Sequence, residues 1–255
     1  MELRTILVTQ ARTGSTRLPG KVLKEVNGKS LLQIHLDRIS KSVRIDEIVV
    51  ATTTNDKDAI IYNNAIEWDY KSFRGSEENV LDRFYHAVKD ENADWIVRVT
   101  SDCPLLDPQL LDEVIEFAQN HNYDYVSNGL IEHFPDGQDV EVFKFLALEK
   151  AWKNATLVSE LEHVTPYIIN NSDVRGGNIF RSINYDCKQD FSHIRMTVDE
   201  SRDFDLIEHL ILELGTEKTW LEYTDYIEAH NLTKMNDQII RNEGLIKSLK
   251  KDING

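Results

Sequence analysis

The sequence predicts an α/β fold in which a mainly parallel sheet is covered by helices on both faces. Two observations support this class. Short apolar runs rich in β-branched and aromatic residues recur along the chain, and amphipathic stretches of helical period separate them. A strand, a crossover helix and a further strand in succession place parallel strands side by side. Because no repeat, low-complexity tract or Gly/Ser-rich linker interrupts the chain, we expect one domain over residues 1–255.

The first half of the chain carries the clearest alternation. We predict strands at residues 4–10, 47–53, 95–101 and 123–129, and helices at 30–42, 79–92 and 109–122. Ser30 and Gln33 have the spacing of a capping box at the start of the first helix. Asp107 is an N-cap candidate, and Pro108 is the proline favoured in a first helical turn. These signals indicate where two of the helices begin.

After about residue 130 the alternation changes. The run "DVEVFKF" (139–145) is typical of an edge or excursion strand, and helices are expected near 146–154 and 159–170. Further strands are predicted at 177–184 and 194–199, and a helix at 200–214. We therefore expect an inserted β-rich lobe at about 130–195 that serves the acceptor or dimerisation, a return to the main sheet, and a C-terminal tail at about 232–255.

Charge is distributed unevenly along the chain. The formal net charge is -15, which argues against nucleic acid or an anionic membrane as a partner. Residues 1–44 nevertheless hold nine Lys/Arg and three Asp/Glu, and no acid lies between Arg4 and Lys24. This local excess of positive charge favours a small anionic ligand such as a nucleotide.

The composition also bears on the compartment. Two cysteines, Cys103 and Cys187, are too few for a disulfide framework or a zinc site. The N-terminus lacks the apolar stretch of a signal peptide, and no run approaches the length of a membrane span. We expect a cytoplasmic protein.

The loop "RTGSTRLPGK" (12–21) follows the first predicted strand. In an open α/β sheet, ligands bind where the carboxyl ends of the strands meet loops and helix N-termini. Five residues separate Gly14 from Gly20, and Val22 follows Lys21, so the loop is not a P-loop. It also lacks the three close glycines of a dinucleotide fingerprint. A solvated basic loop is the simpler reading, but its place at a strand end favours a phosphate-binding loop built on Arg12, Arg17 and Lys21.

Several segments resemble one known family. The chain is similar to the cytidylyltransferases that activate keto-sugar acids, the family of the KDO and acylneuraminate enzymes, and most of all to its spore-coat polysaccharide biosynthesis branch. The resemblance spans nearly the whole chain, in the order "QARTGSTRLPGK" (10–21), "GSEENVLDRFYHA" (75–87), "VRVTSDCPLLDP" (97–108), "DYVSNGLIEHFPDGQDVEVF" (124–143), "EHVTPYI" (162–168), "RMTVDESRDFDLI" (195–207) and "NDQIIRNEGLIKSL" (236–249).

The resemblance implies a Rossmann-like nucleotidyltransferase sheet and a Mg²⁺-dependent transfer of CMP from CTP to a sugar or keto-sugar acid, with release of pyrophosphate. Cations and metal neutralise charge on the phosphates in such a reaction. By resemblance Arg12 and Lys21 grip the triphosphate, whereas Arg17 could equally face solvent or a buried acid. The further nucleotide contacts that it implies are Gln10, Ala11, Gly14, Ser15, Asp82, Arg83 and Arg98.

Asp102 and Asp199 match the metal aspartates of the family. Each closes an apolar run, and Mg²⁺ prefers one or two carboxylates together with phosphate oxygens. The alternative reading of each is a helix N-cap, above all for Asp199, which precedes a predicted helix. Without nucleotide the two carboxylates would repel one another, so we expect either Asp→Asn variant to melt at a higher temperature in the absence of metal.

Other positions keep two readings. Asp82 and Arg83 align with a base-recognising pair of the KDO enzymes but could form an ordinary surface ion pair. Arg98, inside an apolar strand, needs either the nucleotide or a structural carboxylate as its partner. Asp139 and Glu141, expected on one side of a strand, and His163 are candidates for the acceptor site. An edge carboxylate is more often solvated, and a capping or core role suits His163 as well.

The chain departs from the KDO pattern at Cys103, which stands where those enzymes have an acidic residue and is read here as a small buried hydrophobe. The acceptor is therefore left open, and so is the effect of this change on metal use. A glycosyltransferase of the related nucleotide-sugar fold and an inactive nucleotide-binding module are the alternatives. The cations of the first loop favour a triphosphate such as CTP over the nucleotide-diphosphate sugar of a glycosyltransferase. The presence of both Asp102 and Asp199 argues against an inactive module. The relatives suggest a homodimer.

Overall fold

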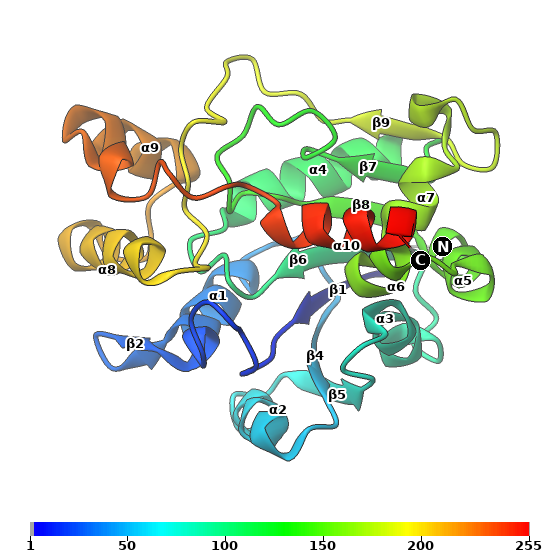
Figure 1. Ribbon diagram of the computed structural model, residues 1–255, viewed down its shortest axis with the longest axis horizontal. Helices are drawn as coiled ribbons and strands as arrows, with labels where there is room; N and C mark the ends of the chain where they lie inside the picture. Colours follow the sequence, from blue (N-terminus) through cyan, green and yellow to red (C-terminus); the bar gives the residue numbers. More distant parts are fainter. Residues whose placement is uncertain (1–2, 255) are drawn as a thin grey trace.

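Seven strands form one central sheet in the computed structural model, which describes residues 3–254. Its order is β5 (Lys71–Gly75), β4 (Glu47–Thr53), β1 (Thr5–Gln10), β6 (Trp95–Thr100), β8 (Glu141–Lys144), β7 (Tyr125–Ser127) and β9 (Ser182–Asn184). All neighbouring pairs are parallel except those that β8 makes with β6 and β7. The predicted α/β class with a mainly parallel sheet is confirmed (Figure 1).

Helices cover both faces of this sheet. In chain order the longer ones are α1 (Leu31–Ile39), α2 (Ala59–Glu67), α3 (Val80–Val88), α4 (Pro108–Asn120), α5 (Phe145–Asn154), α6 (Val158–His163), α7 (Pro166–Asn170), α8 (Ser201–Leu214), α9 (Trp220–Ala229) and α10 (Glu243–Asn254). A short hairpin, β2 (Glu25–Val26) and β3 (Lys29–Ser30), precedes α1. In the described chain, residues 3–254, no helix is long and apolar enough to cross a bilayer.

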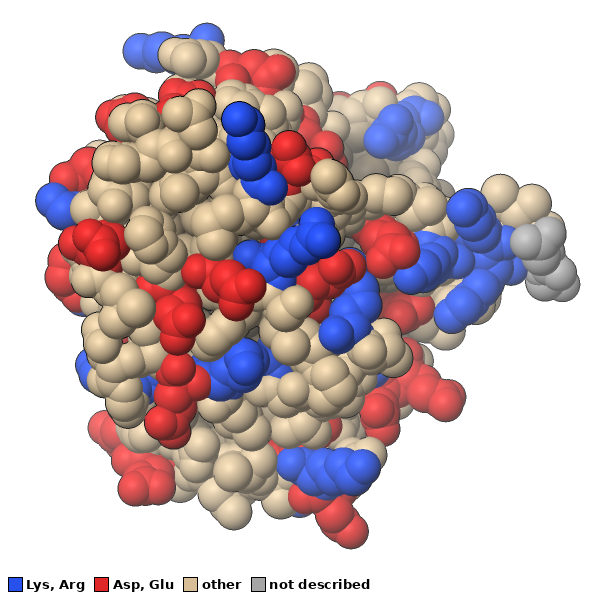
Figure 2. All heavy atoms as spheres, turned by 60° about the vertical axis from the view of Figure 1, so that its left-hand side comes forward, with Lys and Arg blue, Asp and Glu red and all other residues tan. Residues whose placement is uncertain are grey.

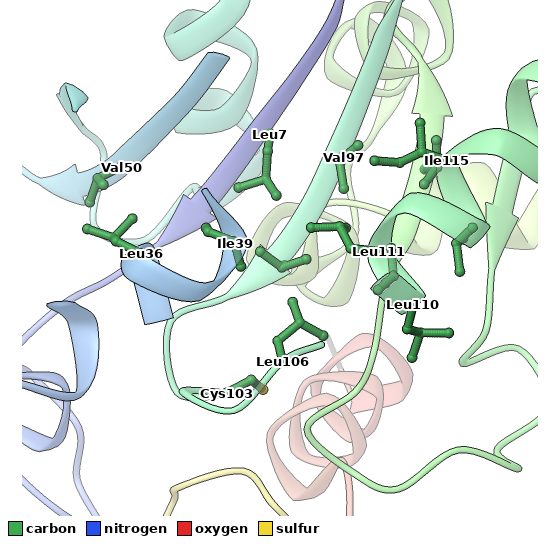
Figure 3. Close-up of a cluster of buried hydrophobic side chains, with 14 of the residues drawn as sticks. Leu7, Leu36, Ile39, Val50, Val97, Cys103, Leu106, Leu110, Leu111 and Ile115 are labelled. Carbon is green, nitrogen blue, oxygen red and sulfur yellow. The ribbon is translucent and has the colours of Figure 1, made fainter. Parts of the chain in front are cut away.

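Two layers of core sandwich the sheet. On one face, strand residues such as Leu7 and Val97 pack against Leu36 of α1 and Leu111 of α4 (Figure 3). The intervening residues of the same strands, such as Ile6 and Ile96, point to the opposite face of the sheet. There they pack against α3, α5 and α7. Cys103 is buried at the edge of the first layer, so its reading as a small hydrophobe is confirmed. Burial of this kind provides the main favourable term in folding.

The predicted helix starts are correct where a capping signal exists. The Ser30 hydroxyl accepts a hydrogen bond from the Gln33 backbone N–H at 3.2 Å, and α1 begins at the next residue. Asp107 accepts from the Gln109 N–H at 2.8 Å and caps α4. Both side chains satisfy an N–H group that the first helical turn leaves without a partner.

Three predicted elements differ in the structure. The strand predicted at 139–145 is not an edge strand, because β8 pairs on both sides and lies inside the sheet. The helix predicted at 159–170 is two helices, interrupted at Val164, whose φ of 71° is outside the helical region. The segment predicted as a strand at 194–199 makes one isolated bridge, between Arg195 and Asp136, and otherwise runs as extended chain over α8.

No helix or strand is predicted from the sequence for α2, β5, α9, α10 or the β2–β3 hairpin. The strands expected within 130–195 continue the central sheet beyond β6, and α10 lies within the expected tail at 232–255. The lobe as an acceptor or dimerisation unit stays a prediction.

Candidate active site

The carboxyl ends of β1 and β6 bring the first loop and the Asp102 loop to one edge of the sheet. The two strands are parallel, and Gln10 is paired with Thr100, so the chain leaves both at the same level. The extended segment that precedes α8 joins them there, because the Val198 N–H donates to the Asp102 carbonyl at 2.8 Å. Lys21, Asp102 and Asp199, which are far apart in the sequence, therefore converge.

Lys21 lies between the two aspartates. Its Nζ donates to Asp102 Oδ2 at 2.7 Å, to Asp199 Oδ1 at 2.9 Å and to the Val198 carbonyl at 2.8 Å. The exposed fractions of the three side chains are 12% for Lys21, 25% for Asp102 and 22% for Asp199. One ammonium thus satisfies two carboxylates in a partly water-excluded site, where such contacts are stronger than in water.

In this cluster the positive charge of Lys21 and the negative charges of the two aspartates each stabilise the ionised form of the other group. Burial would lower the pKa of Lys21, but the nearby Asp102 and Asp199 charges raise it above the ordinary lysine value. Burial would raise the pKa of Asp102, but the Lys21 charge and hydrogen bond hold it well below the ordinary aspartate value. Both groups are therefore ionised at neutral pH. Lys21 lies between the two carboxylates and offsets the repulsion on which the expected higher melting temperature of the Asp→Asn variants is based, and that melting temperature itself stays a prediction.

Arg17 faces acids in this structure. Its guanidinium lies 2.9 Å from Asp199 Oδ1, 3.2 Å from Glu243 of α10 and 3.9 Å from Glu200. Of the readings that the sequence leaves open, the contact with carboxylates is the one observed. A phosphate role for Arg17 stays a prediction.

Asp199 is held from behind by a buried ion cluster. Arg195 donates to Asp199 Oδ2 at 2.8 Å and to Asp203 Oδ1 at 2.9 Å, and it also pairs with Asp136. Burial alone would lower the pKa of Arg195. The hydrogen bonds to Asp203 and the charge of Asp136 outweigh this effect and raise the pKa above the ordinary arginine value. The Asn236 side chain donates to Asp203 at 2.9 Å and so ties the C-terminal segment to the same cluster.

The N-cap reading of the two metal candidates is wrong. The N-cap of α8 is Glu200, and Asp203 accepts the backbone N–H groups of Asp199 and Glu200 at 2.9 and 3.0 Å. Asp107, five residues after Asp102, is the cap of α4. Both Asp102 and Asp199 therefore present their carboxylates to Lys21 instead of to a helix.

The rest of the first loop is folded back on itself. The Gly20 N–H donates to the Thr13 carbonyl at 2.9 Å, and Gly20 has a φ of 68°, which suits glycine. Asp58 accepts the Thr13 N–H and hydroxyl, each at 2.7 Å, and this anchor carries no prediction from the sequence. An acid that follows a strand end is the signal that could have revealed it.

Other predicted loop residues have modest local roles. The Ala11 N–H donates to the Ala51 carbonyl at 3.1 Å, and the Ser15 hydroxyl accepts from the Leu18 N–H at 3.3 Å. A Cβ on Gly14 would meet Glu77 at 3.7 Å, an ordinary contact, so the backbone there does not require glycine. Arg12 is half-exposed, and its recorded ion contact is to Glu77 at 3.9 Å.

Several buried polar side-chain atoms have no hydrogen-bond partner among residues 3–254. They include Gln10 Oε1 at the end of β1, Arg83 Nε on α3 and Arg98 Nε on β6. Arg83 also donates to the Ser76 carbonyl, and its pKa is lowered to about 10, first by burial and then by the charge of Arg12. A buried polar group without a partner costs free energy, so such atoms indicate a place where a ligand would supply the missing hydrogen bond.

Asp82 and Arg83 do not form an ordinary surface ion pair. Arg83 is almost completely buried, whereas Asp82 accepts from Trp152 Nε1 of α5 at 2.9 Å and lies 3.4 Å from His86. Each residue thus has its own surroundings. Their predicted nucleotide contacts stay predictions.

Arg98 has a structural carboxylate as its partner. It pairs with Glu141 of β8, whose other oxygen accepts the hydroxyls of Tyr125 and Thr165, each at 2.6 Å. Glu141 is therefore committed to a buried network and is not a solvated edge carboxylate. Its predicted acceptor contact would require part of that network to break.

Asp139 and His163 contact the C-terminal segment. Asp139 lies before β8, so it does not share a strand with Glu141, and it accepts from Arg241 at 2.6 Å. His163, the last residue of α6, lies 3.1 Å from the Ser248 hydroxyl of α10. Burial and the charge of Arg98 lower its pKa to about 4, which keeps the ring neutral at pH 7. Their acceptor roles stay predictions.

Among residues 3–254, no group of three or more His, Cys, Asp or Glu side chains is arranged to hold a metal ion. A divalent cation at Asp102 and Asp199 would need further ligands from a substrate, which is the usual situation for Mg²⁺ with nucleotides.

Comparisons with known proteins agree on one family. A family model described as cytidylyltransferase matches residues 6–238. An uncharacterized protein of Methanocaldococcus jannaschii, MJ1063, is 42% identical over 206 residues, which are 80% of this chain and 82% of that protein. The spore coat polysaccharide biosynthesis protein SpsF of Bacillus subtilis is 32% identical over 226 residues, 82% of this chain and 87% of SpsF. Several 3-deoxy-manno-octulosonate cytidylyltransferases match about half of the chain.

A solved structure supports the same grouping. The cytidylyltransferase from Leptospira borgpetersenii superposes with a TM-score of 0.86 at 29% identity, over 94% of this chain and 100% of that one. The resemblance that the sequence motifs indicate is therefore confirmed.

Proposed function

This chain belongs to the cytidylyltransferase family and is a CTP-dependent nucleotidyltransferase, and from that premise we propose a Mg²⁺-dependent transfer of CMP to a sugar or keto-sugar acid that is used for a surface polysaccharide. An acceptor hydroxyl oxygen attacks the α-phosphorus of CTP, the bond to the β-phosphate breaks, pyrophosphate leaves, and the hydroxyl proton passes to solvent. The observation that carries the proposal is the convergence of Lys21, Asp102 and Asp199 at the ligand edge of the sheet.

The cations of the first loop suit a triphosphate. Arg12 is half-exposed beside the buried Arg83, and Lys21 presents an ammonium already engaged by three oxygen atoms. Phosphate oxygens are acceptors of the same kind, so the Lys21 ammonium would exchange carboxylate for phosphate contacts when CTP binds. Arg12 would add a guanidinium, whose planar donors match phosphate geometry.

Asp102 and Asp199 fit a divalent metal. Both direct an oxygen at the same ammonium nitrogen, so they meet at a point where positive charge is required, and both are hard oxygen donors. Mg²⁺ bound there would neutralise charge on the phosphates and on the leaving pyrophosphate. Arg195 would hold the second oxygen of Asp199 and fix the orientation of that carboxylate.

We assign recognition of the cytosine base to two buried polar atoms, Gln10 Oε1 and Arg83 Nε. Cytosine offers an amino donor and two acceptors, O2 and N3. Gln10 Oε1 is a buried acceptor and Arg83 Nε a buried donor, and neither has a hydrogen-bond partner in the described part of the chain, residues 3–254. A complementary base would satisfy both, whereas a base without that pattern would leave buried polar atoms unpaired, which is costly.

The polysaccharide role and the acceptor class rest on relatives. SpsF carries a spore coat polysaccharide name, and the resemblance to KDO enzymes suggests an acceptor with several hydroxyl groups. Asp139, Glu141 and His163 lie on the side of the sheet beyond β6, where such an acceptor would enter.

The test is pyrophosphate release measured over the four nucleoside triphosphates, each crossed with a panel of keto-sugar acids, neutral sugars and sugar phosphates, with and without Mg²⁺. We expect CTP to be used at least about tenfold faster than the other three with any accepted acceptor, since one lost hydrogen bond to a buried charged group exceeds about 1.4 kcal/mol. Lys21→Ala should lose this activity, and Lys29→Ala, which removes an exposed cation paired with Asp37, should keep it. Equal use of UTP, or full activity with EDTA, would contradict the proposal.

A further inference from the structure

The C-terminal segment of residues 236–254, which we call the strap, is attached to the rest of the chain by polar contacts. Asn236 is buried, and its side chain donates to Asp203 at 2.9 Å. Ser248 of α10 is also buried, and its hydroxyl donates to Glu162 at 2.6 Å. None of residues 236–254 contributes a side chain to the apolar clusters that the described residues, 3–254, form. Apolar burial is the main favourable term in folding, so we expect the strap to undock at a lower free energy than the core opens.

The strap passes the candidate active site before it reaches α6. Figure 1 shows it, in red, running from the side of α9 across the view to end beside α6. Arg241, just before α10, donates to Asp139 at 2.6 Å, and Glu243, in the first turn of α10, lies 3.2 Å from Arg17. His163, the last residue of α6, lies 3.1 Å from a hydroxyl of α10. The strap thus contacts the first loop and two of the three residues predicted at the acceptor site.

Glu243 places a carboxylate on a guanidinium that the phosphates of CTP would use. Arg17 Nη1 lies 3.2 Å from Glu243 and Nη2 lies 2.9 Å from Asp199, so acids face both terminal nitrogens. Carboxylate and phosphate oxygens are acceptors of the same kind for a guanidinium, so Glu243 occupies a place on Arg17 that a phosphate oxygen would take. Release would not leave the Glu243 charge alone, because Lys247 lies 2.7 Å from it within α10.

We propose that the strap is an autoinhibitory element: when docked it holds Glu243 on Arg17 and opposes the binding of CTP, and the bound triphosphate in turn undocks it. Two groups that compete for one cation are linked, so each weakens the binding of the other by the same factor. The triphosphate also repels Glu243, since both are negatively charged. This inference rests on the proposed function, because it takes a triphosphate to bind beside Arg17.

The contact between Arg17 and Glu243 is weak enough to be displaced. The two side chains are 27% and 31% exposed, so water screens their charges. Figure 2 shows acidic side chains lying among basic ones over the face in view, and each such charge offers a competing partner. A partly exposed ion pair shifts an equilibrium constant by about two- to fivefold. The strap would therefore lower the affinity for CTP without closing the site.

A permanent structural clamp is the alternative reading of the strap. The family model ends at residue 238, so Arg241, Glu243 and α10 lie outside the region that it matches. The region shared with the family thus ends before the contacts of the strap with the first loop, which favours a regulatory role over a catalytic one. The polar attachment of the strap favours movement over a fixed clamp.

The first test measures the binding of CTP with Mg²⁺, in the absence of acceptor, by titration calorimetry. We expect Glu243→Gln to bind CTP about two- to fivefold more tightly than the parent, because the competing charge on Arg17 is removed. Asp237→Asn is the matched control, since it removes the same charge from an exposed position of the strap and should leave the affinity unchanged. Ser248→Ala loosens the strap at a distance from Arg17 and should tighten CTP binding in the same direction as Glu243→Gln. Melting curves check that all three variants are folded.

The outcomes separate this inference from the proposed function. If Glu243→Gln binds CTP no more tightly than the parent, or if Ser248→Ala does not follow it, the autoinhibitory strap is overturned and the proposed function stands. A parent chain that does not bind CTP with Mg²⁺ would overturn both.

The second test measures amide hydrogen exchange in the parent chain, with and without saturating CTP and Mg²⁺. We expect the amides of α10 to exchange at least about twofold faster with the nucleotide, because an undocked helix of 12 residues is marginal in water. The amides of α4, which packs in the core, should exchange at the same rate in both samples and serve as the internal control. Slower exchange in α10 with CTP would show the strap closing over the nucleotide instead of yielding to it, and would overturn the proposal.

Discussion

Replacement of Lys21 by methionine separates the structural role of the first loop from its catalytic role. The sequence resemblance gives Lys21 and Arg12 the same role, because both are expected to bind the triphosphate. In the structure Lys21 is 12% exposed and bridges Asp102 and Asp199, whereas Arg12 is half-exposed and lies 3.9 Å from Glu77. The two residues should therefore respond differently to the same substitution.

The expected loss of stability follows from this geometry. Removal of one partner from a buried ion pair costs about 3–5 kcal/mol. Because Asp102 and Asp199 keep roughly a quarter of their surface exposed, we take the lower end, about 3 kcal/mol. In a chain of this size, 1 kcal/mol shifts the melting temperature by about 2–4 °C, so Lys21→Met should melt about 6–12 °C lower. Arg12→Met should melt within about 2 °C of the parent, since exposed ion pairs contribute little.

Both variants should lose CTP turnover to a similar extent. A charge-assisted contact contributes about 1.5–3 kcal/mol, which corresponds to a loss of about 10- to 150-fold in kcat/KM. Calorimetric melting and pyrophosphate release measure the two effects separately. Added Mg²⁺ should recover part of the stability of Lys21→Met and little of that of Arg12→Met, because a divalent cation can neutralise the two exposed carboxylates.

The double variant Lys21→Met/Asp102→Asn tests the cause of the instability, because the ion pair of Asp102 is with Lys21, whereas Asp199 also pairs with Arg17 and Arg195. With the Asp102 carboxylate neutralised, its repulsion with Asp199 disappears, so the double variant should melt above Lys21→Met alone. If Lys21→Met melts like the parent, or if Asp102→Asn lowers its melting temperature further, the assignment of Lys21 as the counter-ion of both aspartates is wrong.

Three further predictions concern residues around the cluster. Arg83→Met should reduce the preference for CTP over UTP at least about tenfold in pyrophosphate release, because the buried donor assigned to the base is removed. Arg195→Lys should raise the Mg²⁺ concentration that gives half-maximal turnover by about tenfold while the KM for CTP at saturating Mg²⁺ changes little, because a lysine cannot hold Asp199, Asp203 and Asp136 at once. His35 is buried with its pKa lowered to about 4 from 6.5, so the free energy of unfolding should fall by up to about 3 kcal/mol as the pH drops from about 6.5 to 4, and His35→Gln should show a smaller fall in denaturant titrations.

Each of these has a contrary outcome. Unchanged base preference in Arg83→Met would remove Arg83 from base recognition. Equal Mg²⁺ dependence in Arg195→Lys and the parent would restrict Arg195 to the fold. For His35 the sign is fixed: the folded state disfavours the proton, so its contribution to stability is complete above the unfolded pKa and is lost as the pH falls. A parallel pH dependence in His35→Gln would assign the loss to other groups, such as His163, whose pKa is also lowered to about 4.

The sequence predicts the regular parts of the fold well because local signals and tertiary packing agree there. The capped helix starts at Ser30 and Asp107 and the apolar strands β1, β4 and β6 are examples. The prediction fails at 139–145 because alternation cannot distinguish an edge strand from a central one. It fails at 194–199 because apolar residues such as Met196 pack against α8 without a strand partner.

The sequence predicts which residues belong to the candidate site, but it does not predict which of them contact one another. Motif resemblance identifies Lys21, Asp102 and Asp199, but no local pattern states that one ammonium binds both carboxylates. The anchors Asp58 and Asn236 act across long sequence separations, to Thr13 and Asp203, and each looks like an ordinary polar residue in its own segment. Such contacts depend on the topology of the sheet and on the path of the C-terminal segment.

The charge balance of the cluster constrains how a nucleotide can enter. Lys21 and Arg17 are already engaged by Asp102, Asp199 and Glu243, so the first loop is not a ready set of free cations. A triphosphate alone would approach two ionised aspartates, and the repulsion would offset its gain from Lys21. A triphosphate that carries a divalent cation brings the charge that these aspartates require and frees Lys21 for its phosphates. The aspartates would thus discriminate against the metal-free nucleotide, and the acid partners of Lys21 and Arg17 would hold the loop in shape until the metal complex replaces them.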